Sequence, residues 1–285
     1  YSNYAAFGSD LYFYNVNSVH VVVDTFTVAN PWNFYATAVT NSSSITNPYT
    51  FDILNTVHQE VNHDLYVAPW GDDDNSGLNP GEPMQSIFMA MYRIASDPED
   101  PKTVHVADGH YSPSLNNQLF PIPIKSYTSL VGESREGTIL DAEGLCFNVF
   151  VSAYSRKCEL HNVTLLNARK GIDVSYSDSF RTSNVSITNI SNTGIRPIGV
   201  GGPYNSGVIE IRDVSVTNLT SSNCATANMF IQSSGSLMIY NVEITECHAP
   251  EMNAIKISIV DECDVIIDGC EVHDNRSSTT DVLGF

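Results

Sequence analysis

The 285-residue sequence is poor in positive charge, with 13 Lys and Arg residues against 32 Asp and Glu, a formal net charge of −19. We expect no nucleic-acid binding, because neutralising phosphates requires clustered Lys and Arg. The sequence also has no run of about 18 apolar residues, so no membrane span is expected. The acidity suits calcium, and it would also keep a secreted protein soluble. We favour the second interpretation.

Short catalytic motifs are scarce too. The six cysteines form no C-x-x-C, which excludes a zinc ribbon or a thioredoxin-like site. The sequence contains neither H-E-x-x-H nor a G-x-S-x-G nucleophile elbow, although a Ser-His-Asp triad assembled from distant positions stays open. Cys146 could pair with Cys158, and Cys247 with Cys263 or Cys270, in an oxidising compartment.

What the sequence does contain is a repeat. A six-residue segment begins at Asn162, Asn184, Asp213, Asn241 and Gly269, so its copies start 22, 29, 28 and 28 positions apart. Apolar residues at its second and fourth positions alternate with polar ones, as in a strand with one buried face. The terminal Asn and Asp suit turns, because these residues tolerate left-handed backbone geometry. Repeats of this period predict a solenoid.

Other apolar segments surround these copies. Strands are predicted at 208–211, 237–240 and 265–267, before the repeat, and at 172–174, 229–231 and 255–259, after it. Three strands and three turns make one coil of a parallel β-helix, in which coils stack about 4.8 Å apart. The fold is therefore predicted to be all-β, a three-sheet parallel β-helix. Its inward column would contain Val163, Val185, Val214 and Val242, since each coil buries its apolar face against its neighbours.

Two regions are expected along the chain. Residues 1–62 would hold the C-terminal coils of a preceding β-solenoid and a connector, because 11–14, 19–23 and 25–30 are strand-like. Residues 63–285 would form the β-helix, with a helix near 84–95 where apolar residues follow helical spacing after Pro83. No signal peptide is visible and both ends look cut, which favours a mature product or a piece of a longer chain.

An ordered set of motifs lies between Leu65 and Asp141: Tyr-Val-Ala-Pro-x-Gly-x-Asp-x-Asn-Ser-Gly at 66–77, Val-His-Val-Ala-Asp-Gly-x-Tyr-Ser at 104–112, Ser-Leu-Val-Gly-Glu at 129–133 and Thr-Ile-Leu-Asp at 138–141. This set resembles the N-terminal end of the pectin-lyase-like superfamily, especially its secreted modular members of unassigned function on bacterial surfaces. The resemblance implies a right-handed parallel β-helix whose open end is plugged by the helix near 84–95. Such modules occur in exported surface proteins and in polysaccharide lyases and hydrolases, and the fold alone does not choose between these.

The sequence lacks the catalytic motifs that the resemblance implies for those enzymes. The sequence has no Gly-His-Gly and no Arg-x-Lys, the motifs that the resemblance implies for a polygalacturonase. Arg169-Lys170 near Asp173 has some likeness to a lyase site, but a solvated turn explains it better. The outward positions of the repeat are mostly hydroxyls and end in two acids: Thr164, Ser186, Ser215, Glu243 and Glu271. Only the two acids, Glu243 and Glu271, are weak catalytic candidates.

The best ion candidate is the loop Asp72, Asp73, Asp74 and Asn75, since calcium prefers several carboxylate and carbonyl oxygens. An acidic surface loop is the alternative. We expect an extracellular or cell-surface module that acts as a stalk, adhesin or glycan-binding segment, with polysaccharide or other surface proteins as partners. The alternative function is a polysaccharide lyase or glycoside hydrolase acting on the exposed sheet.

Overall fold

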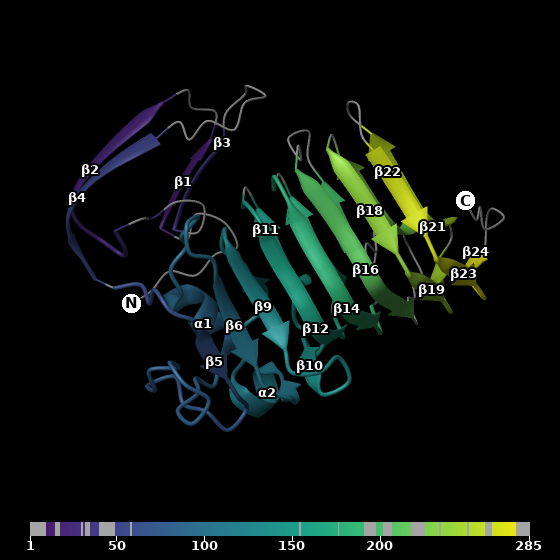
Figure 1. Ribbon diagram of the computed structural model, residues 1–285, viewed down its shortest axis with the longest axis horizontal. Helices are drawn as coiled ribbons and strands as arrows, with labels where there is room; N and C mark the ends of the chain where they lie inside the picture. Colours follow the sequence, from purple (N-terminus) through teal and green to yellow (C-terminus); the bar gives the residue numbers. More distant parts are fainter. Residues whose placement is uncertain are drawn as a thin grey trace.

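The computed structural model describes residues 10–14, 18–29, 31, 35–39, 49–57, 59–153, 155–175, 177–190, 198–201, 207–217, 226–233, 235–249, 251–259 and 264–277. From residue 65 onward the chain forms a parallel β-solenoid, whose coils stack along one axis from blue to yellow in Figure 1. Three parallel sheets make its sides. The predicted all-β, three-sheet fold is therefore confirmed.

The first side, called the front sheet below, runs the length of this solenoid. Its strands pair in parallel from one coil to the next, as Figure 1 shows. In order they are β5 (Leu65–Val67), β6 (Lys102–Val106), β9 (Thr128–Gly132), β12 (Cys158–Leu166), β14 (Phe180–Thr188), β16 (Val208–Thr217), β18 (Ser236–Tyr240) and β22 (Asp264–Asp268).

The second side follows a sharp corner. The residues at this corner take left-handed geometry, with φ of 56° at Asn162, 55° at Asn184, 51° at Asp213 and Asn241, and 64° at Gly269. The corner explains why each repeat begins with Asn, Asp or Gly. Three strands, β12, β14 and β16, run through it, and the other strands of this side are β7 (Gly109–Tyr111), β10 (Thr138–Asp141), β19 (Glu243–Thr245) and β23 (Glu271–His273).

The third side closes each coil. It is a separate six-stranded parallel sheet, and a short pair of strands, β20 (His248–Ala249) and β24 (Arg276–Ser277), lies beside it. Its strands are β8 (Ile122–Pro123), β11 (Asn148–Ala153), β13 (Lys170–Ser175), β15 (Ile198–Gly201), β17 (Thr226–Ser233) and β21 (Glu251–Ile259).

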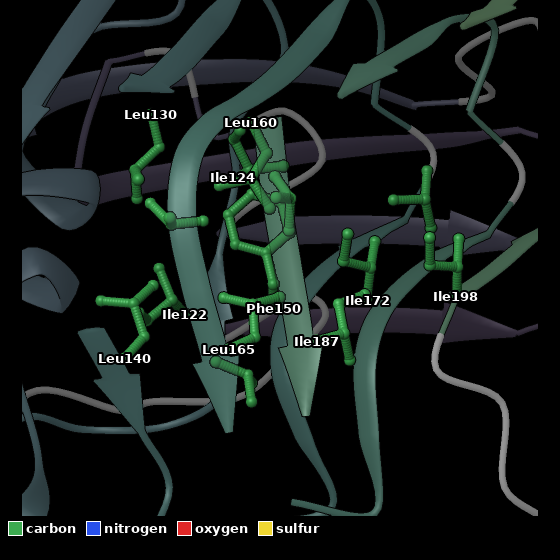
Figure 2. Packing of buried hydrophobic residues seen from close by; sticks show 14 of the residues in the cluster. Ile122, Ile124, Leu130, Leu140, Phe150, Leu160, Leu165, Ile172, Ile187 and Ile198 are labelled. Atoms are coloured by element: carbon green, nitrogen blue, oxygen red, sulfur yellow. The ribbon is translucent and has the colours of Figure 1, made fainter. Parts of the chain in front are cut away.

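Stacked apolar side chains fill the interior between the three sheets. Val163 pairs with Val185, and Val185 with Val214, and these residues and Val242 are at most 1% exposed, which confirms the predicted column. Figure 2 shows Phe150 among leucines and isoleucines of neighbouring coils. Each fully buried Val, Leu or Ile contributes about 1.5–3 kcal/mol, so the stack supplies most of the driving force for folding.

The corner residues also hydrogen-bond to one another. The Asn184 side-chain amide donates to Asn162 Oδ1 at 3.0 Å, and the Asn241 amide donates to Asp213 Oδ1 at 2.9 Å. At the next corner, the Asn167 amide donates to Asp141 Oδ1 at 2.7 Å. These ladders satisfy polar side chains that the stacking of coils partly removes from water.

Helix α1 (Ile87–Arg93) covers the N-terminal end of the solenoid, and Ile87, Ala90 and Met91 are fully buried. It is shorter than the helix predicted near 84–95. The difference arises because Met84 forms a parallel bridge with Val67. Ser86 then caps the helix by accepting a hydrogen bond from the Met89 amide at 3.1 Å.

A second helix, α2 (Pro113–Asn116), follows directly after β7. Ser112 caps α2, and Pro113 occupies its first turn.

The N-terminal region forms two parallel strand pairs. β1 (Leu11–Tyr14) pairs with β3 (Ala36–Val39), and β2 (Val19–Phe26) pairs with β4 (Tyr49–Thr56). The expected strands at 11–14 and 19–23 are therefore present. Of the strand-like segment 25–30, only Thr25 and Phe26 lie in a strand, as the end of β2; residues 27–29 are irregular, and residue 30 lies outside the described residues.

A buried ion pair joins this region to α1. Lys125 Nζ lies 2.7 Å from Glu60 Oε1, and it donates to the carbonyl oxygens of Tyr92 and Ile94 at 3.0 and 2.7 Å. Burial lowers the pKa of Lys125, and Glu60 partly offsets that effect. The Tyr35 hydroxyl donates to the Tyr92 carbonyl oxygen at 2.6 Å, so the same helix end anchors the N-terminal region.

The described cysteines, Cys146, Cys158, Cys247 and Cys270, are free, so the proposed pairs Cys146–Cys158 and Cys247–Cys270 are not formed. Cys263 lies outside the described residues. Burial raises the pKa of the Cys158 thiol to about 11. In the described part of the chain, no helix has the length and apolar character needed to cross a membrane.

Candidate functional site

The outward side of the front sheet carries a column of aromatic, titratable and polar side chains. It forms because strand residues alternate between the two faces and every coil repeats the same register. Successive strands contribute Tyr66, His105, Val131, His161, Ser183, Arg212, Tyr240 and Asp268. We call this set the front column.

A groove opens at the N-terminal end of the front column. Its volume is about 500 Å³, and its lining includes Tyr66, Trp70, Pro83, His105 and Glu133. The rings of Tyr66 and His105 stack with centroids 4.9 Å apart and planes inclined by 19°. Trp70 is 71% exposed beside them. A contiguous apolar patch rimmed by polar residues can mark a ligand-binding groove.

Polar groups hold this aromatic platform in place. His105 Nε2 lies 3.2 Å from Asp64 Oδ2, and the Thr103 amide donates to Asp64 Oδ1 at 2.8 Å. A second hollow, of about 680 Å³, shares Tyr66 and includes His63, Asp64 and Lys102. The two hollows share Tyr66, and together their linings contain three acids, Asp64, Asp100 and Glu133, and one lysine, Lys102.

A charged network occupies the middle of the front sheet. Arg181 lies between Glu159 and Glu210, 3.5 Å from a carboxylate oxygen of each. Arg212 lies 3.1 Å from Glu210 and 4.3 Å above the ring of Tyr240. Such a network fixes the orientation of side chains that would be mobile as isolated surface ion pairs.

His161 connects the network to the front column. Its Nε2 lies 3.2 Å from Glu159 Oε2, and its Nδ1 lies 2.7 Å from Ser183 Oγ. The hydrogen bond from His161, aided by the charge of Arg181, holds the pKa of Glu159 below its usual value. Glu159 is therefore ionised at neutral pH and is unsuited to act as a general acid.

The two acids of the repeat lie where the sequence indicated. Glu243 is the register partner of Glu271, and both are exposed on the second side. Their backbones are therefore about 4.8 Å apart. His273 lies 4.0 Å from Glu271 and 2.9 Å from Asp274, and the hydrogen bond with Asp274 raises the pKa of His273. The catalytic role of Glu243 and Glu271 stays a prediction.

In the loop expected to bind calcium, the side chains of Asp73 and Asn75 hydrogen-bond to the backbone just before α1. Asp73 Oδ1 accepts hydrogen bonds from the amides of Gln85 and Ser86 at 3.0 and 2.8 Å. Asp72 Oδ1 accepts one from the Asp74 amide, and the Asn75 side chain donates to the Pro83 carbonyl oxygen. Among the described residues, no three His, Cys, Asp or Glu side chains gather as a metal set. The calcium site stays a prediction.

The cluster with some likeness to a lyase site is internally paired. Lys170 Nζ lies 2.7 Å from Asp173 Oδ2, and both side chains are at least three-quarters buried. Arg169 and Lys170 lie over the ring of Phe147, at 5.7 and 5.3 Å from its centroid. A base for β-elimination has to reach a sugar carbon, and these contacts tie the two cations to their own turn.

Sequence reasoning missed the front-sheet network, because it examined the outward residues of the repeat and not those of the strand before it. The signal was present at fixed offsets from each corner. The residue three positions before the corner is charged in each of three coils: Glu159, Arg181 and Glu210. The residue one position before the corner is polar in the same coils: His161, Ser183 and Arg212.

Residues 70–282 match a protein family described as "Protein of unknown function (DUF1565)". The match covers well over half of the chain, so the chain belongs to this family, and its fold is a parallel β-solenoid. No curated protein and no solved structure gives a significant match.

Proposed function

We propose that this chain is a glycan-binding module of an extracellular or cell-surface protein, and that its solenoid is the right-handed β-helix of the pectin-lyase-like superfamily. The observation that supports binding most strongly is the groove, where exposed Trp70 lies beside the stacked rings of Tyr66 and His105. Aromatic rings offer sugars a rigid apolar face, and a few polar groups around them fix orientation.

The geometry suits an extended ligand. Tyr66, His105 and Val131 lie on successive coils, about 4.8 Å apart, so a chain molecule lying along the solenoid axis would meet all three. Glu133, Asp64 and Asp100 surround the two hollows, while Lys102 is paired with Asp100. This charge distribution favours neutral or amine-bearing glycans over polyuronates, because like charges repel.

The experiment is a glycan array probed with the purified chain, followed by calorimetry on the glycans that bind. Trp70→Ala should weaken binding by about 2 kcal/mol, roughly 30-fold, since truncation removes a central aromatic contact. Its thermal stability should not change, because the side chain is exposed. Tyr12→Ala is the matched control, as Tyr12 is 54% exposed in the N-terminal region. Equal binding by the wild type and Trp70→Ala would refute the site.

A further inference from the structure

Ser183, His161 and Glu159 form a hydrogen-bonded chain on the front sheet. The Ser183 hydroxyl lies 2.7 Å from His161 Nδ1, and His161 Nε2 lies 3.2 Å from Glu159 Oε2. With its proton on Nε2, His161 donates to the carboxylate and accepts from the hydroxyl. This connectivity is that of a serine nucleophile, a general base and a carboxylate that orients the base.

The fold produces this arrangement by register. His161 and Ser183 are direct partners on β12 and β14, and Glu159 lies two residues before His161 on the same face of β12. The side chains of His161 and Glu159 are 22% and 32% exposed, so ligands can reach them while the network keeps them ordered. Arg181 contacts Glu159 from β14 and helps to keep it ionised.

An arginine lies on the strand next to that of the nucleophile. Arg212 is the register partner of Ser183 on β16, so their backbones are about 4.8 Å apart. The contacts of Arg212 with Glu210 and with the ring of Tyr240 hold its guanidinium over the sheet. If this guanidinium turned from Tyr240 toward Ser183, it would stabilise the oxyanion that forms when a carbonyl is attacked.

We propose that this triad is a serine esterase site that removes O-acyl groups from a saccharide. The substrate class follows from position, because His161 pairs with Val131, which lines the aromatic groove. A glycan bound in the groove and continuing along the front sheet would bring its acyl substituents to Ser183. The assignment of a sugar ester as substrate therefore rests on the proposed glycan binding. The proposal that His161 activates Ser183 does not depend on it.

The reaction needs only the ester and water. Ser183 Oγ attacks the carbonyl carbon and its proton passes to His161 Nδ1. The tetrahedral oxyanion collapses with loss of the sugar oxygen, which leaves with the proton from Nδ1. Water then attacks the acyl-serine and gives a proton to Nδ1. The bond to Ser183 breaks, the hydroxyl recovers its proton, and a carboxylic acid is released.

The first test is covalent labelling of the intact chain with a fluorophosphonate, followed by mass spectrometry of its peptides. Ser183 should carry the adduct, and Ser183→Ala should abolish it. Ser186→Ala is the matched control, since Ser186 lies on the same strand with Thr164 and Ser215 as its register partners. Labelling of another serine, or equal labelling of Ser183→Ala and wild type, would overturn the proposal.

The second test is hydrolysis of p-nitrophenyl acetate. Ser183→Ala and His161→Gln should each lower the rate at least about 100-fold, since each removes a group that acts in the same step. Glu159 is a positioning residue, so Glu159→Gln should lower kcat and leave KM unchanged. Hydrolysis that persists undiminished in Ser183→Ala would contradict the proposal, as an exposed histidine attacking by itself would give that result.

Glycan binding at the groove and esterase activity at Ser183 can be refuted independently of each other. Trp70→Ala should weaken glycan binding about 30-fold, whereas Tyr12→Ala should leave both glycan binding and fluorophosphonate labelling of Ser183 intact. Acetate release from an acetylated oligosaccharide should require both Trp70 and Ser183. If p-nitrophenyl acetate is hydrolysed through Ser183 but no glycan binds, the activated serine stands and the saccharide substrate is wrong.

Discussion

Replacing Val185 by Asp tests whether stacking of coils holds the solenoid together. Val185 is fully buried between Val163 and Val214 in the inward column. The next residue, Ser186, points outward between Thr164 and Ser215, so Ser186→Asp places the same charge on the other face of the same strand. The pair of variants therefore differs in side-chain direction and little else.

The expected loss at Val185 is large. Removing the buried side chain costs about 1.5–3 kcal/mol. Keeping the new carboxyl protonated at pH 7, from an ordinary pKa near 3.9, costs about 4 kcal/mol. Burying it without a hydrogen-bond partner costs about 1–3 kcal/mol more. Together these terms reach roughly 7–10 kcal/mol, comparable to the whole stability of a typical domain, so the coils around β14 should lose their structure.

The penalty should also depend on pH. The fold would raise the pKa of the introduced carboxyl above its unfolded value, so the variant should be most stable below about pH 4. It should lose about 1.4 kcal/mol per pH unit as the pH rises. Urea denaturation followed by circular dichroism at several pH values measures this. Similar losses for Val185→Asp and Ser186→Asp would refute the inward column.

Three further outcomes are expected. Lys125→Met should cost about 3–5 kcal/mol in urea denaturation, because it leaves Glu60 buried without its partner, and adding Glu60→Gln should restore part of that loss. If Asp72–Asn75 bind calcium, EDTA should lower the melting temperature and excess calcium restore it, and an unchanged temperature would identify the loop as helix-capping surface. The chain alone should not break glycosidic bonds in pectate, alginate or neutral glycans; new reducing or unsaturated ends that vanish in Glu243→Gln or Glu271→Gln would support the hydrolase alternative.

The sequence specified the solenoid well because its signals are local and repeated. The alternation around Val163, Val185 and Val214 fixes which face is buried, and the left-handed Asn162 and Asn184 fix where each coil turns. The sequence predicted helix α1 at the correct place, but the predicted range 84–95 is longer than the observed helix, Ile87–Arg93. Helical spacing does not reveal that the backbone of Met84 pairs with β5.

The candidate site was less visible, because it is assembled from different coils. The rings of Tyr66 and His105 stack although the two residues are 39 positions apart in the sequence. Their contact depends on the register between β5 and β6, and that register depends on the length of the intervening loop and helix. Glu159, His161 and Ser183 could have been brought together from the sequence by aligning each strand on its corner residue.

The account depends most directly on Trp70 contacting the glycan. The chain contains two tryptophans, so Trp32→Phe leaves Trp70 as the only one. In that variant, titration with a glycan identified on the array should give a saturable blue shift of the fluorescence emission. Its midpoint should match the calorimetric Kd, because the sugar displaces water from the exposed ring. Calorimetric binding with no change in Trp70 emission would place the glycan elsewhere and contradict the proposed site.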